Sequence, residues 1–344
     1  MVRQGKQALG LFERYLTLWV IICLFAGILI GNLFPSLSEL LGTWVIPGTS
    51  VPMIVGVCLF LMIYPILVNT QFEKLREALK APGPLFTNVF YVWTAKPLIM
   101  FVLAWFFLKM LWNLPEYAIG IIVLGCAPCT VMVMFWSMLA DSSVEFCIIL
   151  CAVHSVIMLV MYAPLVYFLT GLIIYVPWEP VALSVTIFLG LPLLLGVITR
   201  YTALQSKGSE WFESKLSPAL SYLAMVGLFM NLVVLFSLKG HVFVQSPLLT
   251  FKIATPQIIE SYLDFAVAYA VSKLLKFPYE YASVSGIVAS GNHTELTIAT
   301  TIATWGIASS QALAGTVGPL VEVPIMLSIA GICLKTRKYF PKNS

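Results

Sequence analysis

The sequence predicts an all-α membrane protein with ten transmembrane helices. Of its 344 residues, 60% are hydrophobic and only 10% are charged, whereas an ordinary soluble chain is roughly 25% charged. The apolar runs have about the 20 residues that a helix needs to cross a bilayer, and they do not alternate as membrane β-strands do. This composition excludes two soluble domains, a disordered chain, a disulfide-rich secreted domain and a nucleic-acid-binding protein.

Ten apolar runs give the spans in order. The first follows basic residues, but it is too long for a signal peptide and lacks a clear cleavage site, so we expect it to remain in the protein. The predicted spans are 15–34, 48–69, 85–108, 117–139, 144–171, 180–199, 217–238, 248–275, 281–304 and 308–334.

The basic residues predict the orientation, because Lys and Arg favour cytoplasmic loops. With the N-terminus inside, all of the 19 Lys and Arg residues fall on the cytoplasmic side except Lys96, Lys109, Lys239 and Lys252. An odd number of spans destroys this asymmetry. We therefore expect a multi-pass protein of the cell membrane with both termini in the cytoplasm.

Two of the spans are interrupted near mid-membrane. In the fourth, Pro128 removes a backbone donor, so the helix should fail near 125–129. In the ninth, the polar run 290–295 separates two apolar stretches. A helix broken at this depth must line a cavity or be buried in protein, and transporters build binding sites from such breaks.

The two interruptions lie five spans apart, an odd number, so the two halves should have opposite orientations. This predicts inverted repeats over 1–171 (spans 1–5) and 172–344 (spans 6–10). The alternative is a proline kink and an unrelated polar patch that serves helix packing.

The interruptions carry the candidate site residues. Glu295 is a carboxylate at a depth where charge is costly and usually marks an ion or proton pathway; the alternative is a protonated side chain used in helix packing. Cys129 follows the proline break and offers a soft ligand for metalloids, although most membrane cysteines only pack. Neutral donors and acceptors that suit a small hydroxylated solute or a dehydrated cation are Thr130, Ser290, Asn292, His293 and Thr294.

Further charges lie deep in other spans. Glu260 and Asp264 in span eight are four residues apart and share a helix face. Lys96 in span three lies at a depth similar to that of Glu260, so we predict that the two pair, because an unpaired ion is hard to keep charged there. Glu322, between two prolines of span ten, is a candidate for lining a cavity or for bonding between helices.

At these residues the chain resembles the arsenite-efflux permeases of the arsenical-resistance type, relatives of the bile acid/sodium symporters. The resemblance runs nearly end to end. It rests on the order and spacing of Glu13–Trp19, Gly27–Pro35, Met62–Leu67, Ala127–Thr130 with Trp136 and Ser137, Phe236–Gly240, Asn292–Leu296 and Gly318–Pro324.

The resemblance implies that broken helices 4 and 9 cross at the substrate site. It implies a core of spans 3–5 and 8–10 that rocks against a panel of spans 1, 2, 6 and 7. It also implies export of arsenite, with antimonite as a further candidate, in exchange for protons. The essential cysteine and glutamate of that family fall on Cys129 and Glu295.

The chain departs from the family pattern at the site. The ninth-span motif usually reads Asn-Asn-Phe-Glu-Leu, but His293 and Thr294 stand here at its second and third positions. The third-span motif usually reads Asn-Trp-x-x-Gly-Pro, but here Val92 replaces the Asn and Lys96 replaces the Gly. These changes leave the coupling stoichiometry and the substrate range open.

We expect a transporter, with arsenite, protons and the lipid bilayer as partners and without a cofactor, a metal or a nucleic acid; a homodimer is left open. The predicted binding residues are Cys129, Thr130, Asn292, His293 and Glu295. Of these, Glu295 couples transport to the proton.

One alternative is a sodium-coupled organic-anion symporter, with sodium held by Asn292, Ser290 and Glu295. Another is an intramembrane enzyme with Cys129 as nucleophile and His293 as base, although no third catalytic member is recognisable.

Overall fold

The computed structural model describes residues 16–34, 42–47, 49–74, 82–130, 132–174 and 176–341. Helices make up most of this part of the chain, and its β-structure consists of two isolated bridges. Residue 15, where the first span is predicted to begin, lies outside the described residues, as does the side chain of Lys239.

The helices fall on the predicted apolar runs. Each interrupted span appears as two helices, α7 with α8 and α14 with α15, and short π-helical turns extend three of the others. The helices are α2 (Leu16–Leu33), α4 (Met53–Asn69), α6 (Pro82–Ala104), α7 (Pro115–Gly125), α8 (Val133–Leu139), α9 (Val144–Gly171), α10 (Trp178–Val185), α11 (Leu191–Trp211), α12 (Ser217–Gln245), α13 (Pro247–Leu274), α14 (Tyr279–Ser290), α15 (Thr294–Trp305) and α16 (Ser310–Thr336).

By length and composition alone, four helical stretches of the described part can cross a membrane. They are Pro82–Leu111, Val144–Gly171, Trp178–Leu238 and Ser310–Tyr339. The third stretch contains α10, α11 and α12 in succession, and α4 and α7 are apolar but shorter. Large apolar side chains face outward, among them Phe25, Phe86, Val160 and Leu248, as expected of a surface that faces lipid.

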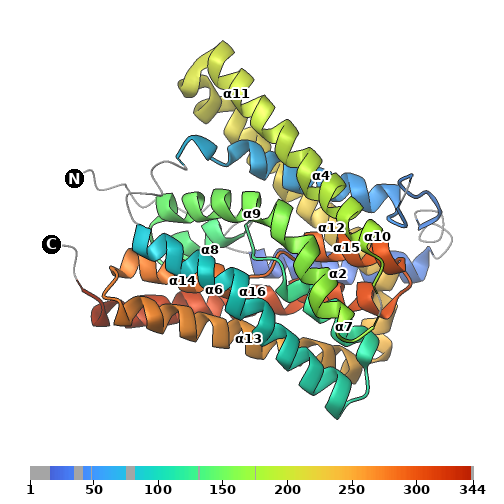
Figure 1. The fold of residues 1–344 in the computed structure, drawn as a ribbon. Helices are drawn as coiled ribbons and strands as arrows, with labels where there is room; N and C mark the ends of the chain where they lie inside the picture. Colours follow the sequence, from blue (N-terminus) through green and yellow to red (C-terminus); the bar gives the residue numbers. More distant parts are fainter. Residues whose placement is uncertain are drawn as a thin grey trace.

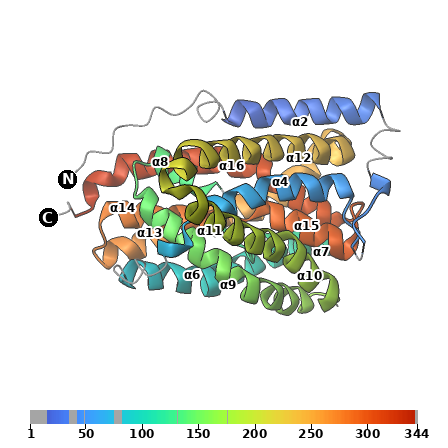
Figure 2. The same ribbon diagram turned by 90° about the horizontal axis from the view of Figure 1, so that it is seen from above.

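One group of helices forms a side of the molecule. Figure 2 shows α2 at one edge with α12 beside it, and α12 also packs against α4, which contacts α11. Gly31 lets α2 approach α12, because a Cβ there would lie 2.2 Å from the carbonyl oxygen of Ser237. Small residues allow such close helix contacts in membranes.

The remaining helices enclose the interrupted spans. α13 packs against α14, α6 and α16, while α7 packs against α16 and α6. Every residue of α7 from Ala118 to Gly125 is buried, as is every residue of α14 from Ala282 to Ser290. The broken helices therefore lie inside protein, which is where helix breaks are tolerated at membrane depth.

Some helices run further than the apolar pattern predicts. α11 continues to Trp211, whereas the sixth span was expected to end at residue 199, and it is kinked at Gly208, whose φ is 81°. The added residues are mostly polar, but Ala, Leu, Gln and Lys are good helix formers, so the helix continues past the apolar segment. In Figure 1 this end of α11 projects from the body of the molecule together with the start of α12, where Leu204 packs against a cluster that contains Leu220.

Candidate functional site at the crossed helix breaks

Both predicted breaks are present. α7 ends at Gly125 and α8 begins at Val133, while α14 ends at Ser290 and α15 begins at Thr294. In Figures 1 and 2, α7 and α15 lie toward one end of the molecule and α8 and α14 toward the other. The breaks therefore occupy the middle, where four helix ends converge.

The two breaks pair with each other. Pro128 and Asn292 form an isolated antiparallel bridge. The Cys129 N–H donates to the Gly291 carbonyl over 3.1 Å, and the His293 N–H donates to the Ala127 carbonyl over 2.8 Å. Each break thus satisfies backbone groups that the other has freed, so that the polar backbone at the centre is not left unpaired.

The crossing leaves little room for a side chain at Gly291. A Cβ at Gly291 would lie 2.9 Å from the Cβ of Cys129, a distance that real side chains essentially never show. Cys129 and Thr130 are both buried, with 2% and 4% of their surface exposed. The predicted cysteine is therefore held directly against the start of the polar run in the ninth span.

His293 and Glu295 lie together where α15 begins. His293 is the N-cap residue, and its Nδ1 accepts a hydrogen bond from the Leu296 N–H over 3.4 Å. The same Nδ1 lies 3.1 Å from Glu295 Oε2. The imidazole and the carboxyl group are therefore held side by side at the start of α15.

A second carboxylate lies against the same helix end. Thr294 Oγ1 donates to Glu322 Oε2 over 3.0 Å, a bond between α15 and α16. Gln257 Nε2 donates to the Gly318 carbonyl over 3.3 Å. Gln257 was missed by the sequence reasoning, since a single amide in an apolar run gives no distinctive signal.

Several buried acceptors at these residues have no hydrogen-bond partner within the described part of the molecule. They are Asn292 Oδ1, Gln257 Oε1 and Glu322 Oε1. A buried polar atom without a partner is uncommon and calls for an explanation. Acceptors without donors suit a ligand that brings its own hydroxyl hydrogens.

The predicted Lys96–Glu260 pair is confirmed. Lys96 Nζ lies 3.6 Å from Glu260 Oε1, and both side chains are completely buried. The ammonium also donates to the carbonyl oxygens of Ala289 and Gly291 over 2.7 and 2.6 Å. The pair is therefore built into the break of the ninth span.

Both carboxylates of α13 also bond to neighbouring side chains. The second oxygen of Glu260, Oε2, accepts from Asn292 Nδ2 over 3.0 Å. Asp264 Oδ1 accepts from the Tyr91 hydroxyl on α6 over 2.6 Å. The sequence reasoning did not identify Tyr91, which lies five residues before Lys96 on the same helix.

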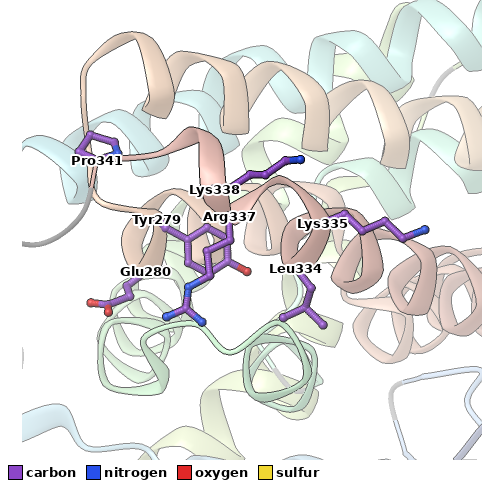
Figure 3. Close-up of a pocket in the computed structure, with 7 residues that line it drawn as sticks. All are labelled: Tyr279, Glu280, Leu334, Lys335, Arg337, Lys338 and Pro341. Carbon is purple, nitrogen blue, oxygen red and sulfur yellow. The ribbon is translucent and has the colours of Figure 1, made fainter.

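A pocket lies elsewhere, at the end of α16. Figure 3 shows its lining, which contains none of the predicted site residues: Tyr279, Glu280, Leu334, Lys335, Arg337, Lys338 and Pro341. Arg337 pairs with Asp141, and its guanidinium lies 5.2 Å from the centre of the Tyr279 ring. The crossing itself is nearly closed, since Glu295 is 8% exposed.

Among the described residues, no group of three or more His, Cys, Asp and Glu side chains is arranged to hold a metal ion. The crossing thus offers one thiol, carboxyl groups, an imidazole, amides and backbone carbonyls. This set can bind a small neutral hydroxylated solute or a hard monovalent cation, and it can store a proton.

The Sodium Bile acid symporter family matches residues 56–246, more than half of the chain. An uncharacterised transporter of Synechocystis is 40% identical over 97% of this chain and 91% of its own length. The arsenical-resistance protein Acr3 of Alkaliphilus metalliredigens is 36% identical over 99% of this chain and 97% of its own. Acr3 of Corynebacterium glutamicum is 33% identical over 95% and 90%.

Proposed function

The chain belongs to the Sodium Bile acid symporter family, and we propose that it is a secondary transporter that exports arsenite in exchange for protons. The observation that carries the proposal is the pairing of the two breaks. It holds Cys129 against Gly291, four residues before Glu295, in a buried centre.

We assign the chain ten spans, with both termini in the cytoplasm and inverted repeats over 1–171 and 172–344. The panel consists of α2, α4, α10 with α11, and α12, and the other helices form the core. The mutual packing of α2, α4, α11 and α12 supports this division. Rocking of the panel against the core opens the closed crossing to each side in turn.

The chemistry of arsenite fits the crossing. Near neutral pH arsenite is mostly an uncharged hydroxide, so it enters a dry site without the cost of burying an ion. Its hydroxyl groups donate to the unpartnered acceptors of Asn292, Gln257 and Glu322. Cys129 is the soft neighbour of the arsenic atom, and antimonite meets the same requirements.

Glu295 carries the coupling proton. With the site open to the outside, Glu295 takes up a proton, which the 3.1 Å contact with His293 then holds. With the site open to the cytoplasm, the proton leaves and arsenite binds. Exchange is obligatory because the core changes sides only when the acid is protonated or the substrate is bound.

Uptake of arsenite into everted vesicles with an acidic interior tests this assignment. We expect Cys129→Ser and Glu295→Gln each to lower proton-driven uptake by at least about tenfold, equivalent to about 1.4 kcal/mol of lost transition-state or coupling free energy. Cys126→Ser is the matched control, because Cys126 is also buried beside the break but makes no cross-break hydrogen bond of its own. Parental uptake by both site variants, at equal protein levels, contradicts the assignment.

The two alternatives are less well supported. Two of the relatives are named for arsenical resistance, which does not favour a sodium-coupled organic-anion symporter. An enzyme with His293 as base for Cys129 is disfavoured because Nδ1 of His293 is engaged by Leu296 and Glu295 of its own helix.

A further inference from the structure

The ammonium group of Lys96 lies in a cage of oxygen atoms. Its Nζ is 2.7 Å from the Ala289 carbonyl oxygen, 2.6 Å from that of Gly291 and 3.6 Å from Glu260 Oε1. Carbonyls freed by a helix break, together with a carboxylate, are the ligands that hold sodium ions in transporters with broken helices. Here a side chain of the protein occupies such a cage.

The cage requires a positive charge. The carbonyls of Ala289 and Gly291 lie at the C-terminal end of α14, which carries a partial negative charge. Glu260 adds a carboxylate that is completely buried, and Asp264 follows one helical turn later on the same face. Removal of one partner from a buried ion pair is strongly destabilising, so a cage without a cation should cost the protein stability.

The geometry also fixes where the charge acts. The Gly291 carbonyl accepts from both Lys96 Nζ and the Cys129 N–H, so the cation and the cross-break bridge share one oxygen atom. Asn292, the next residue, donates to the other oxygen of Glu260. The cation thus stabilises the extended backbone that joins α14 to α15.

We propose that the Lys96 ammonium is a tethered cation that takes the place of an alkali metal ion at the break of α14, so that the protein works without sodium and gains a sodium site when the ammonium is removed. This inference goes beyond the proposed function and does not depend on the identity of the transported solute. Lys96→Ala empties the cage but leaves its carbonyls and Glu260, and a sodium ion then fills it.

The test compares thermal unfolding of the purified full chain in NaCl and in N-methylglucamine chloride of equal concentration. The parent should unfold at the same temperature in both salts. Lys96→Ala should unfold at a lower temperature than the parent in N-methylglucamine chloride and should recover by roughly 3 °C or more as NaCl is titrated to saturation. Lys96→Gln, which retains a polar oxygen, should respond to NaCl in the same direction.

Two control variants separate the cage from a general salt effect. Lys96→Met fills the same space without a charge, so its unfolding temperature should fall and should not respond to sodium. Lys252→Ala removes a lysine of α13 whose ammonium lies over the Trp112 ring, away from the cage. This variant should resemble the parent in both salts.

Three results would overturn the proposal. The first is a saturable rise of the parent's unfolding temperature with sodium. The second is a folded Lys96→Ala or Lys96→Gln whose unfolding temperature does not change with sodium, and the third is failure of both variants to fold even when purified in NaCl. None of the unfolding measurements uses arsenite, so the proposed function can fail separately. In the vesicle assay, parental uptake should be independent of sodium, whereas uptake by Lys96→Ala should require it.

Discussion

At the scale of single residues, the Lys96–Glu260 pair shows how charge is kept in the centre of this membrane protein. Both side chains are buried, and every strong contact of the ammonium is with an oxygen atom. Glu260 is held from the other side by Asn292. The pair therefore links α6, α13 and the break between α14 and α15.

Glu260→Gln should destabilise the protein by about 3–5 kcal/mol, because it leaves the Lys96 ammonium buried without its carboxylate. Unfolding by denaturant in detergent measures the change in free energy. Glu213→Gln, at an exposed carboxylate of the segment that follows α11, should change the stability by less than about 0.5 kcal/mol. Equal stability of the two variants contradicts a structural role for the pair.

The pairing of Lys96 with Glu260 was predictable because depth within a span can be counted along the sequence. The Tyr91–Asp264 and Gln257–Gly318 bonds were not predictable, since each depends on how two helices are rotated about their axes. Hydropathy gives the position of a residue along a helix, but it gives weak information about rotation when nearly all faces are apolar.

At the scale of helices, close packing depends on the absence of side chains at a few positions. α2 approaches α12 at Gly27 and Gly31, where added Cβ atoms would lie within 3 Å of the backbone or side chain of α12. Large apolar side chains of α2 such as Phe25 and Leu29 face outward, while Cys23 is buried and Trp19 packs against Phe229 of α12.

Gly31→Ala should displace α2 from α12 and cost about 1–3 kcal/mol, as overpacking of a tight contact does. The matched control is Gly331→Ala in α16, where an added Cβ meets nothing within 4 Å. The measurement is the thermal unfolding temperature of each variant in detergent. A loss of stability in Gly331→Ala equal to that in Gly31→Ala contradicts this account of the contact.

The helix breaks were predictable for different reasons. Pro128 cannot donate a backbone hydrogen bond, so the failure of the fourth span followed from one residue. The ninth break lacks proline, and it was indicated by the polar run that contains Asn292 and Glu295. That the two breaks pair through Pro128 and Asn292 was not predictable from either segment alone, because the pairing is a contact between residues far apart in the sequence.

At the scale of the whole molecule, the two broken helices, far apart in the sequence, meet at one crossing. The Cys129 N–H bonds to Gly291, and the His293 N–H bonds to Ala127. Lys96 and Glu260, from the third and eighth spans, close the same point from the side. The candidate site therefore exists only when segments from both ends of the sequence are assembled, and the hydrogen bonds between the breaks tie the two together.

A disulfide across the crossing tests whether the two breaks meet as described. A disulfide needs Cβ atoms about 4 Å apart. A Cβ at residue 291 would lie 2.9 Å from that of Cys129, so a small outward shift of the two side chains brings the pair to bonding geometry. With Gly291→Cys and a protease site inserted at the exposed Ser209, oxidation should keep the two fragments together on a denaturing gel until reductant is added. If the fragments separate without reductant, while the variant is folded, the breaks do not cross and the proposed site is contradicted.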